Sequence, residues 1–368
     1  MESVTTPGSP STEFRIPDHP AITGVGLVTS LGATAAQTWD ALLAGHCITN
    51  HMRLNEFSGP NRVADLAQVA AAEAMSQANW TAQTRSSSDT ALIVATSKGP
   101  VEAWLAGSLS QYGLADPTTL LARTLSFGLG LRLTYSAACA SGLHALARAA
   151  LALRCGEASR ALVIAVEASA HPLFIASFQR LGVLAPKDYG CRPFDQTRKG
   201  FIISEAAAAV CLEFSPDKDL VRLENCRIAA DATHLTGSDP DAKSLRMMLH
   251  QLVGAYPIDL FHAHSTATLA NDPIELAAIK QFARVNSPIL YSHKGALGHT
   301  LGVAGLVSVV LNSLCHKSGT VPQNVRSTFP LPMDGLIFSQ SVVRRPIRRS
   351  VAIAAGFGGA LGAVTLIS

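Results

Sequence analysis

The sequence has few charged residues, and the two signs nearly cancel. Asp, Glu, Lys and Arg make up 15% of its 368 residues, and the formal net charge is +3. So small a charge does not indicate a nucleic-acid-binding protein. The chain is 48% hydrophobic, which is enough for a large buried core and indicates two domains or two fused halves.

The sequence also lacks closely spaced cysteine pairs. No Cys-x-x-Cys motif occurs, and the scattered spacing indicates neither a disulfide framework nor a structural zinc site. This pattern favours a reducing compartment. The seven cysteines are Cys47, Cys139, Cys155, Cys191, Cys211, Cys226 and Cys315.

Targeting and membrane-spanning segments are missing as well. The first 20 residues are rich in Ser, Thr and Pro and contain no apolar core like that of a signal peptide. The longest apolar run, residues 301–311, contains glycines and a serine and is too short to span a bilayer. We therefore expect residues 1–14 to form a flexible tail on a cytoplasmic protein without a membrane span.

Apolar runs that predict strands alternate with segments of helical periodicity along the whole chain. This alternation predicts an α/β fold with parallel or mixed sheets covered by helices, in an N-terminal half, 15–216, and a C-terminal half, 217–368. Nearly continuous apolar strands indicate that both sheet faces are covered. Strands are predicted at 21–28, 90–95, 131–137, 161–166, 206–212, 221–229, 260–263, 289–292, 351–355 and 363–367, and helices at 34–44, 63–78, 140–155, 273–282 and 303–314.

One cysteine stands where a predicted strand runs directly into a predicted helix. Residues 134–142 read TYSAACASG, so that Cys139 enters the first helical turn among small neighbours. A helix N-terminus carries a partial positive charge and unpaired N–H groups, which favour a thiolate. We therefore expect a lowered pKa and a nucleophilic Cys139. The alternative is an inert cysteine buried at a strand–helix junction.

Two histidine motifs lie in the C-terminal half. His264 follows a predicted strand within residues 262–268, HAHSTAT. His262 and His264 could suggest a metal site, but no third ligand is evident nearby. The second motif, residues 292–305, is Gly-rich and carries His299 to another strand–helix junction. This loop lacks the GxxxxGK[ST] order of a phosphate-binding loop.

A fourth motif is the Gly-rich segment 355–362, AGFGGALG, near the C-terminus. Backbone without side chains lets a ligand approach closely, and its N–H groups can receive an oxyanion. A plain Gly-rich hairpin is the alternative.

Taken together, in this order, the four motifs resemble the β-ketoacyl synthases of the thiolase superfamily. The resemblance extends from residue 21 to the C-terminus and includes RPFD at 192–195, RKGF at 198–201, and Asn271-Asp272 followed by Glu275. It implies a thiolase-like fold of two similar halves, layered α-β-α-β-α. It also implies decarboxylative Claisen condensation of an acyl thioester with malonyl-acyl carrier protein, in fatty-acid or polyketide-type biosynthesis.

The resemblance assigns catalytic roles to five side chains. Cys139 would hold the acyl group as a thioester. His264 and His299 match the two histidines of the elongating, decarboxylating synthases and would donate hydrogen bonds to the thioester carbonyl of the extender. Lys294 and Glu275 would form an ion pair that orients the histidines.

The remaining assigned residues would contact the substrate. The N–H groups of Cys139 and Phe357 would form the oxyanion hole. Thr266 and Thr268 would contact the pantetheine arm of the carrier. Phe357, the gate of the acyl pocket, and Gly358 would also bind substrate.

The resemblance further implies no metal and no cofactor besides the phosphopantetheine of the acyl carrier protein. It implies a homodimer, or a heterodimer with a related subunit, packed through the strand before Cys139. Because carrier proteins of this kind are acidic, Arg198, Lys199 and the basic cluster at 344–349 are candidate docking residues. A solvated turn is the alternative interpretation of that cluster.

Several positions depart from the pattern of the family. His262 replaces the usual Asn, Ser265 the usual Gly, the segment 204–208 reads SEAAA where Gly-Glu-Gly-Ala-Gly is usual, and Ala360-Leu361 replaces Thr-Asn. The region 45–95, which helps to wall the acyl pocket in the family, looks shortened. These changes favour a synthase of a specialised pathway.

Three rival interpretations share the fold. A thiolase would normally carry a second cysteine in the C-terminal Gly-rich loop, and 356–362 has none. A non-catalytic chain-length-factor subunit usually lacks the nucleophile, whereas Cys139 is present. An acyltransferase without decarboxylation is disfavoured, though not excluded, by the pair His264 and His299.

Overall fold

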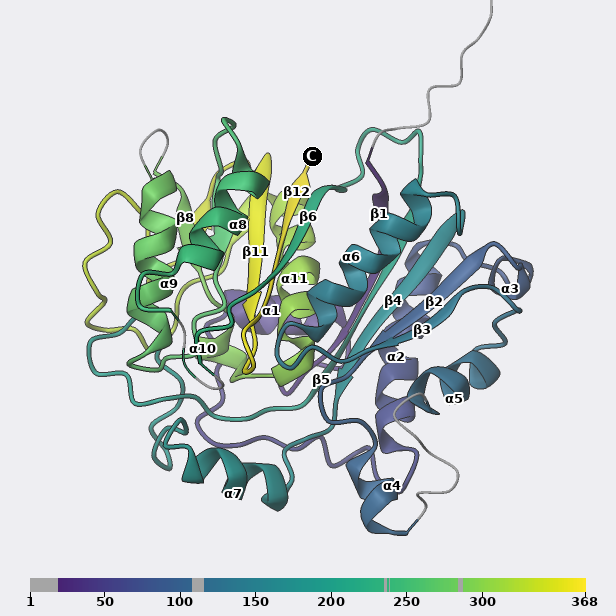
Figure 1. The fold of residues 1–368 in the computed structure, drawn as a ribbon, viewed down its shortest axis with the longest axis horizontal. Coiled ribbons are helices and arrows are strands. Elements are labelled where there is room, and N and C mark those ends of the chain that lie inside the picture. The colour runs from purple at the N-terminus through teal and green to yellow at the C-terminus, as the bar shows by residue number, and fades with distance from the viewer. Residues whose placement is uncertain (1–18, 108–115, 235–236, 238, 284–286) are drawn as a thin grey trace, which may run out of the picture.

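A computed structural model describes residues 19–368 except 108–115, 235–236, 238 and 284–286 (Figure 1). The tail predicted at 1–14 lies outside the described residues, and the half boundary at 216/217 stays a prediction.

Ten strands form one mixed sheet in the order β3-β2-β4-β5-β1-β6-β12-β11-β7-β8. The first half of the chain supplies β1 (Ala21–Val28), β2 (Thr90–Ala95), β3 (Arg132–Tyr135), β4 (Arg160–Glu167) and β5 (Ala206–Glu213). The second half supplies β6 (Arg222–Ala230), β7 (Leu260–His262), β8 (Ile289–Tyr291), β11 (Arg349–Ala355) and β12 (Ala360–Ile367), while β9 (Thr320–Val321) pairs with β10 (Val343–Arg344) separately.

The two halves of the sheet repeat one topology. β2 pairs in parallel with β3 and β4, and β4-β5-β1 are antiparallel. In the same way β7 pairs in parallel with β8 and β11, and β11-β12-β6 are antiparallel. A short ladder at Ala21 and Arg222 joins the halves. The predicted α/β fold with two similar halves is therefore confirmed.

Helices cover both faces of each half-sheet. α2 (Arg62–Gln77) packs on the first half, α8 (Lys243–Val253) on the second, and α6 (Ser141–Arg154) and α11 (Ala304–Ser318) lie between them (Figure 1). The remaining helices are α1 (Ala35–Leu43), α3 (Ala82–Ser86), α4 (Val101–Leu105), α5 (Asp116–Thr124), α7 (Pro172–Arg180), α9 (Asn271–Ile279), α10 (Lys294–Leu297), η1 (Lys280–Phe282) and η2 (Leu301–Val303).

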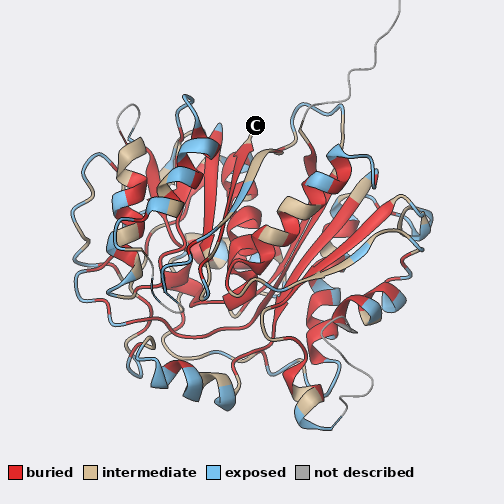
Figure 2. Ribbon diagram, in the orientation of Figure 1, coloured by how far each residue is buried: buried red, intermediate tan, exposed pale blue. Residues whose placement is uncertain are grey.

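The alternation of side chains along the strands shows that the fold has five layers. In β2, Ile93 packs into the central cluster around α6 and α11, whereas Leu92 and Val94 pack into the cluster against α2. In β11, Ala352 faces the central cluster and Ile353 faces α8 and α9. Strands with two covered faces must be apolar throughout, as the sequence indicated, and Figure 2 shows them buried.

The predicted elements occur with boundaries shifted by a few residues. Thr34 caps α1, since its side chain accepts a hydrogen bond from the Gln37 N–H. The predictions did not include α3, α4, α5, α7 and α8. The segment Leu301–Ser318 is longer than the predicted apolar run and could cross a membrane by length and composition alone. However, 78% of it is buried inside the protein, as in a core helix.

A buried ion pair ties three segments of the first half together. Arg62, 1% exposed, donates hydrogen bonds to the Glu205 carboxylate and to the Leu54 and Phe57 carbonyls. Glu205, fully buried, also accepts from the N–H groups of Leu54 and Ala170. The segment 204–208 differs from the usual sequence at several positions, but it keeps Glu205, and this carboxylate anchors the loops around it.

We expect Arg62→Met to lower the free energy of unfolding by about 3–5 kcal/mol, because it leaves the buried Glu205 carboxylate without its cation. Urea denaturation measures the loss. Arg148→Met is the matched control, since the Arg148–Glu157 pair lies at the surface with its Glu side chain 42% exposed, and it should cost less than about 1 kcal/mol. Equal losses in the two variants would contradict the structural role of Arg62.

Candidate active site

The four sequence motifs meet in one pocket where strands of both halves end. β3 leads to Cys139, β7 to His264, β8 to the segment with His299, and β11 to Gly356, and all four residues line the pocket. The turn after β11 points into the lower centre of the molecule, above α7 (Figure 1). Three reactive side chains and one glycine, from four places in the sequence, therefore converge where strands end.

A strained turn presents Cys139. Ala138 has a φ of 47°, in the left-handed region that a residue with a side chain rarely adopts. The Ser141 hydroxyl holds the turn, since it donates to the Ala138 carbonyl at 2.6 Å and accepts from the Ala137 N–H at 2.9 Å. The helix begins at Ser141, so Cys139 precedes it and does not lie in its first turn.

The prediction of a lowered pKa for Cys139 is wrong for this structure. Burial of the thiol, which is 9% exposed, raises its pKa to about 11. The Lys98 and Lys294 cations lower the pKa, but burial in an apolar pocket outweighs them. Cys139 is therefore a thiol at neutral pH, and its proton must leave when it is acylated.

The Gly-rich turn after β11 packs directly on the backbone of Cys139. A Cβ atom at Gly356 would lie 2.9 Å from the Cys139 nitrogen and 3.0 Å from the Ala137 carbonyl oxygen. Within the described part of the chain, neither the Cys139 N–H nor the Phe357 N–H donates a hydrogen bond. Two unpaired N–H groups are therefore available at the pocket for the predicted oxyanion hole, which stays a prediction.

The peptide unit of His264 is held by a carboxylate and an ammonium group. The Glu275 carboxylate accepts from the N–H groups of His264 at 2.6 Å and Ser265 at 2.7 Å. The Lys294 ammonium donates to the His264 carbonyl. Lys294 and Glu275 do not pair directly, because they bind opposite sides of the same peptide unit. The predicted direct ion pair is therefore wrong, although both groups do fix His264.

Burial shifts the pKa values of these two groups in opposite directions. It lowers the pKa of Lys294 to about 8, against the attraction of the Glu275 charge. It raises the pKa of Glu275, against the hydrogen bonds from the Ser265 and His264 N–H groups and the Lys294 charge. An ammonium group with a pKa of about 8 stays mostly charged at neutral pH.

The two histidine rings lie side by side and are neutral. Their centroids are 5.4 Å apart at an interplanar angle of 79°. Burial and the Lys294 cation lower the pKa of both imidazoles well below the usual range. The Nδ1 atom of His299 accepts the Leu301 N–H at 3.3 Å, so the neutral ring carries its proton on Nε2. His299 can therefore donate a hydrogen bond.

The predicted substrate-contacting residues fall into two groups. Thr266, Thr268 and Phe357 line the pocket, and the two threonine hydroxyls lie 2.9 Å apart. Gly358 is exposed and is not among the lining residues. The fully buried Asp272 accepts the N–H of Ala267, the residue between the two threonines, at 3.1 Å.

His262, which replaces the usual Asn, has a structural place behind the pocket. It is fully buried, with Nδ1 2.8 Å from the Asn312 side-chain oxygen and Nε2 2.8 Å from Nδ1 of His293. Its partners are thus an amide and a second imidazole. In the described ranges no group of three or more His, Cys, Asp or Glu side chains is arranged to hold a metal ion.

Sequence reasoning missed Lys98 and Phe178. Phe178, on α7, lines the pocket and lies 6.1 Å from Phe357, centroid to centroid. Lys98, in the loop after β2, places its ammonium group 5.6 Å from the Phe178 ring. A polar segment at the end of a buried strand was an available signal for Lys98. No sequence pattern pointed to Phe178.

Two of the candidate docking residues are buried. Arg198, 6% exposed, binds the carbonyls of Thr268 and Asp195, and Arg349, 8% exposed, binds Glu224 and the Val253 carbonyl. Their prediction as surface docking groups is wrong, because carbonyl groups and, for Arg349, the Glu224 carboxylate already accept from their donors. The cluster at 344–349 also lies at the start of β11, about 20 Å from its pocket end at ~3.3 Å per residue.

We expect Gly356→Ala to slow acylation of Cys139 by about 100- to 1,000-fold, because the new methyl group would push the two N–H groups apart. The rate is measured by stopping the reaction with an acyl thioester at a series of times and determining the acylated fraction of the protein by intact-mass spectrometry. Gly156→Ala, at the opposite end of α6, is the control: no atom lies within 4 Å of a Cβ there, and the strain that its φ of 70° places on a side chain stays local. Unchanged acylation in Gly356→Ala would remove this turn from the oxyanion hole.

Family models match most of the chain. The β-ketoacyl synthase N-terminal domain matches residues 55–217, and the C-terminal domain of the same family matches residues 221–328.

Individual proteins agree with this match. The 3-oxoacyl-[acyl-carrier-protein] synthase 2 of Mycobacterium leprae (strain TN) is 31% identical over 248 residues, which cover 62% of this chain and 58% of that protein. The chain thus aligns with little more than half of that relative.

Solved structures share the fold. A ketosynthase assembly described as a type II PKS acyl-carrier protein in complex with its ketosynthase bound to the hexaketide superposes with a TM-score of 0.86, at 21% identity, over 95% of this chain and 99% of that one. The ishigamide ketosynthase/chain length factor gives a TM-score of 0.83, at 24% identity, over 95% and 99%. The chain belongs to the β-ketoacyl synthase family.

Proposed function

We propose that the protein is an elongating β-ketoacyl synthase, which condenses an acyl thioester with a malonyl thioester and releases CO2. The observation that carries the proposal is the meeting of Cys139, His264 and His299 in one pocket beside two unpaired N–H groups, those of Cys139 and Phe357. Each of these groups has a separate task in a two-step reaction.

In the first step Cys139 takes the acyl group from its carrier. The sulfur attacks the thioester carbonyl, and the N–H groups of Cys139 and Phe357 stabilise the oxyanion. The C–S bond to the carrier breaks, and the carrier leaves as a thiol with the proton that Cys139 loses. The hydroxyl groups of Thr266 and Thr268 would guide the pantetheine arm, and Phe357 would gate the acyl pocket.

In the second step a malonyl thioester replaces the first carrier. His264 and His299 donate hydrogen bonds to its thioester carbonyl, which stabilises the enolate formed as CO2 leaves. The enolate carbon attacks the acyl carbonyl, and the bond to the Cys139 sulfur breaks. One proton is consumed, because a carboxylate leaves as neutral CO2 and the thiolate returns to the thiol.

We infer the partners from the same family. The carrier would be an acidic acyl carrier protein that delivers substrates on phosphopantetheine, with no other cofactor needed. β3 is the edge strand of the sheet, and its free edge would pair with a second copy or a related subunit. A compared structure pairs a ketosynthase with a chain length factor. All seven cysteines are free, which fits a cytoplasmic location. The departures from the family pattern support a specialised pathway.

A non-catalytic partner subunit is the second candidate, favoured by the raised pKa of Cys139. The test is an incubation with acyl-loaded carrier, followed by intact-mass measurement, and then a CO2-release assay with malonyl carrier. We expect an acyl adduct that disappears in Cys139→Ala and persists in Cys155→Ala, which removes an exposed thiol.

His299→Ala separates the two steps. Acylation of Cys139 should persist, while CO2 release falls by about 100-fold or more, because the enolate loses one hydrogen-bond donor. No adduct with any donor, in the isolated chain or with a related subunit added, would contradict the proposed function.

A further inference from the structure

A buried carboxylate of the first half is fixed in the interior, and the proposed reaction does not use it. Glu167 is the last residue of β4 and is 1% exposed. Its carboxylate accepts the Ser97 N–H and, at 2.7 Å, the Ser169 hydroxyl. Ser97 follows β2 and Ser169 follows β4, so two loops of the first half hold the carboxylate in place.

The turn that orients His299 is strained. Leu301 has a φ of 49°, in the left-handed region that a residue with a side chain rarely adopts. Its N–H donates to Nδ1 of His299, which leaves the proton of the neutral ring on Nε2, the atom that would donate to the extender. Strained backbone persists only when its surroundings over-determine it. The donor role of His299 therefore depends on what holds this turn.

Glu167 lies directly against the strained turn. η2 contacts the strand that ends at Glu167. A Cβ atom at Gly302, the residue after Leu301, would lie 2.6 Å from Oε1 of Glu167 and 3.0 Å from the Ser97 nitrogen. The φ of Gly302 is outside the left-handed region, so the glycine is needed here for space. The backbone of Gly302 thus packs against a carboxylate that the first half holds in place.

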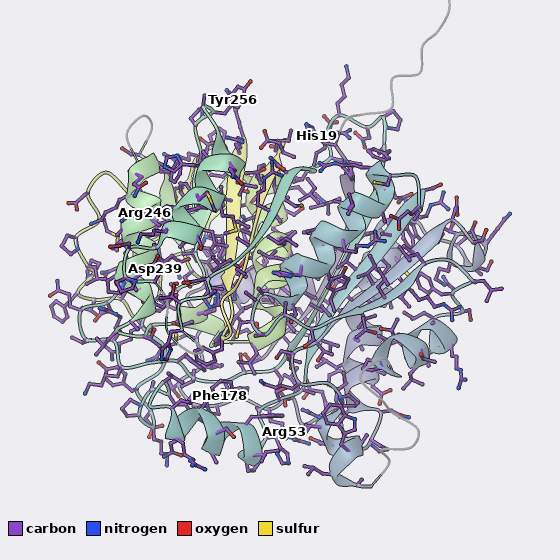
Figure 3. All side chains as sticks on the ribbon, in the orientation of Figure 1. His19, Arg53, Phe178, Asp239, Arg246 and Tyr256 are labelled. Atoms are coloured by element: carbon purple, nitrogen blue, oxygen red, sulfur yellow. The ribbon has the colours of Figure 1, made fainter. Side chains whose placement is uncertain are left out.

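The same carboxylate is close to the rest of the site. Burial raises the pKa of Cys139, and the negative charge of Glu167 raises it further. Burial also raises the pKa of Glu167, and the Lys98 cation opposes this rise. The Lys98 ammonium lies 5.6 Å from the ring of Phe178, a pocket-lining residue at α7 (Figure 3). Glu167 therefore links the side of the pocket that bears the nucleophile to the turn after His299.

We propose that Glu167 is a positioning residue for His299 in the decarboxylation step. Its carboxylate supports Gly302, which keeps Leu301 in the left-handed conformation and the Leu301 N–H on the His299 ring. The length of the side chain carries this role and its charge does not, because Gly302 meets the carboxylate by packing. The inference rests on the proposed function, because it assigns a residue to the step in which CO2 leaves.

Two substitutions at Glu167 separate length from charge. Glu167→Gln keeps the length and both hydrogen bonds, since its oxygen can accept the Ser97 N–H and its amide can donate to the Ser169 oxygen. Glu167→Asp keeps the charge but withdraws the carboxylate by one methylene group. We expect CO2 release from malonyl carrier to stay within about threefold of the native rate in Glu167→Gln. It should fall by about 100-fold in Glu167→Asp, the usual cost of misplacing a catalytic group by about 1 Å.

Acylation of Cys139 is measured in the same variants by intact mass. It should stay within about threefold of the native rate in Glu167→Asp, and it should not slow in Glu167→Gln, because loss of the negative charge favours the thiolate. In a His299→Ala background, Glu167→Asp should cause less than about twofold further loss of CO2 release, since the support has no ring left to orient.

Glu213→Asp is the matched control. Glu213 pairs with the first residue of β4, at the far end of the strand from Glu167, and its partly buried carboxylate also accepts two side-chain hydrogen bonds. This variant should release CO2 at the native rate. The urea midpoint of every variant is measured in parallel.

Other outcomes overturn the inference and identify its error. Loss of CO2 release in Glu167→Gln assigns the role to the charge. Equal slowing of acylation and CO2 release in Glu167→Asp, or a full further loss in the His299→Ala background, shows a general structural role. If the native chain releases no CO2, the proposed function fails too, whereas native release in both Glu167 variants contradicts only this inference.

Discussion

The site depends on how one peptide unit, that of His264, is held. The Glu275 carboxylate accepts the N–H groups of His264 and Ser265, and the Lys294 ammonium donates to the His264 carbonyl. The loop needs this hold, because Ser265 and Ala267 have φ angles of 21° and 58°, and such backbone persists only when its surroundings over-determine it. Burying two charges is costly unless they are well bonded. Here the bonds fix the ring of His264 against that of His299.

The site is also shared between the two halves of the fold. The first half supplies Cys139, and the second supplies both histidines and the turn after β11. Close packing of the middle layer brings them together. A Cβ at Gly305 on α11 would lie 2.6 Å from the Leu143 side chain on α6, and one at Gly142 would lie 3.1 Å from Leu306. Side chains at these two positions would separate α6 from α11, and with them the nucleophile from the histidines.

The sequence reveals features that depend on local pattern. Strands with two covered faces, the strand–helix junction at Cys139 and the Gly-rich turn at Gly356 are visible because each is encoded within about ten residues. Features that depend on tertiary packing are not visible in the sequence. The raised pKa of Cys139 comes from burial by residues far away in the chain. The burial of Arg198, and the separation of Lys294 from Glu275 by a peptide unit, likewise depend on loops that periodicity does not place.

The central claim is that Glu275 acts by positioning His264, and Glu275→Gln tests it most directly. Gln keeps the size of the side chain but offers only one carbonyl oxygen, so it cannot accept both N–H groups. We predict that acylation of Cys139 stays within about threefold of the native rate, while CO2 release from malonyl carrier falls by about 100-fold, as expected when a catalytic hydrogen bond is lost. The urea midpoint is measured in parallel. Native CO2 release in a folded Glu275→Gln variant would contradict the account.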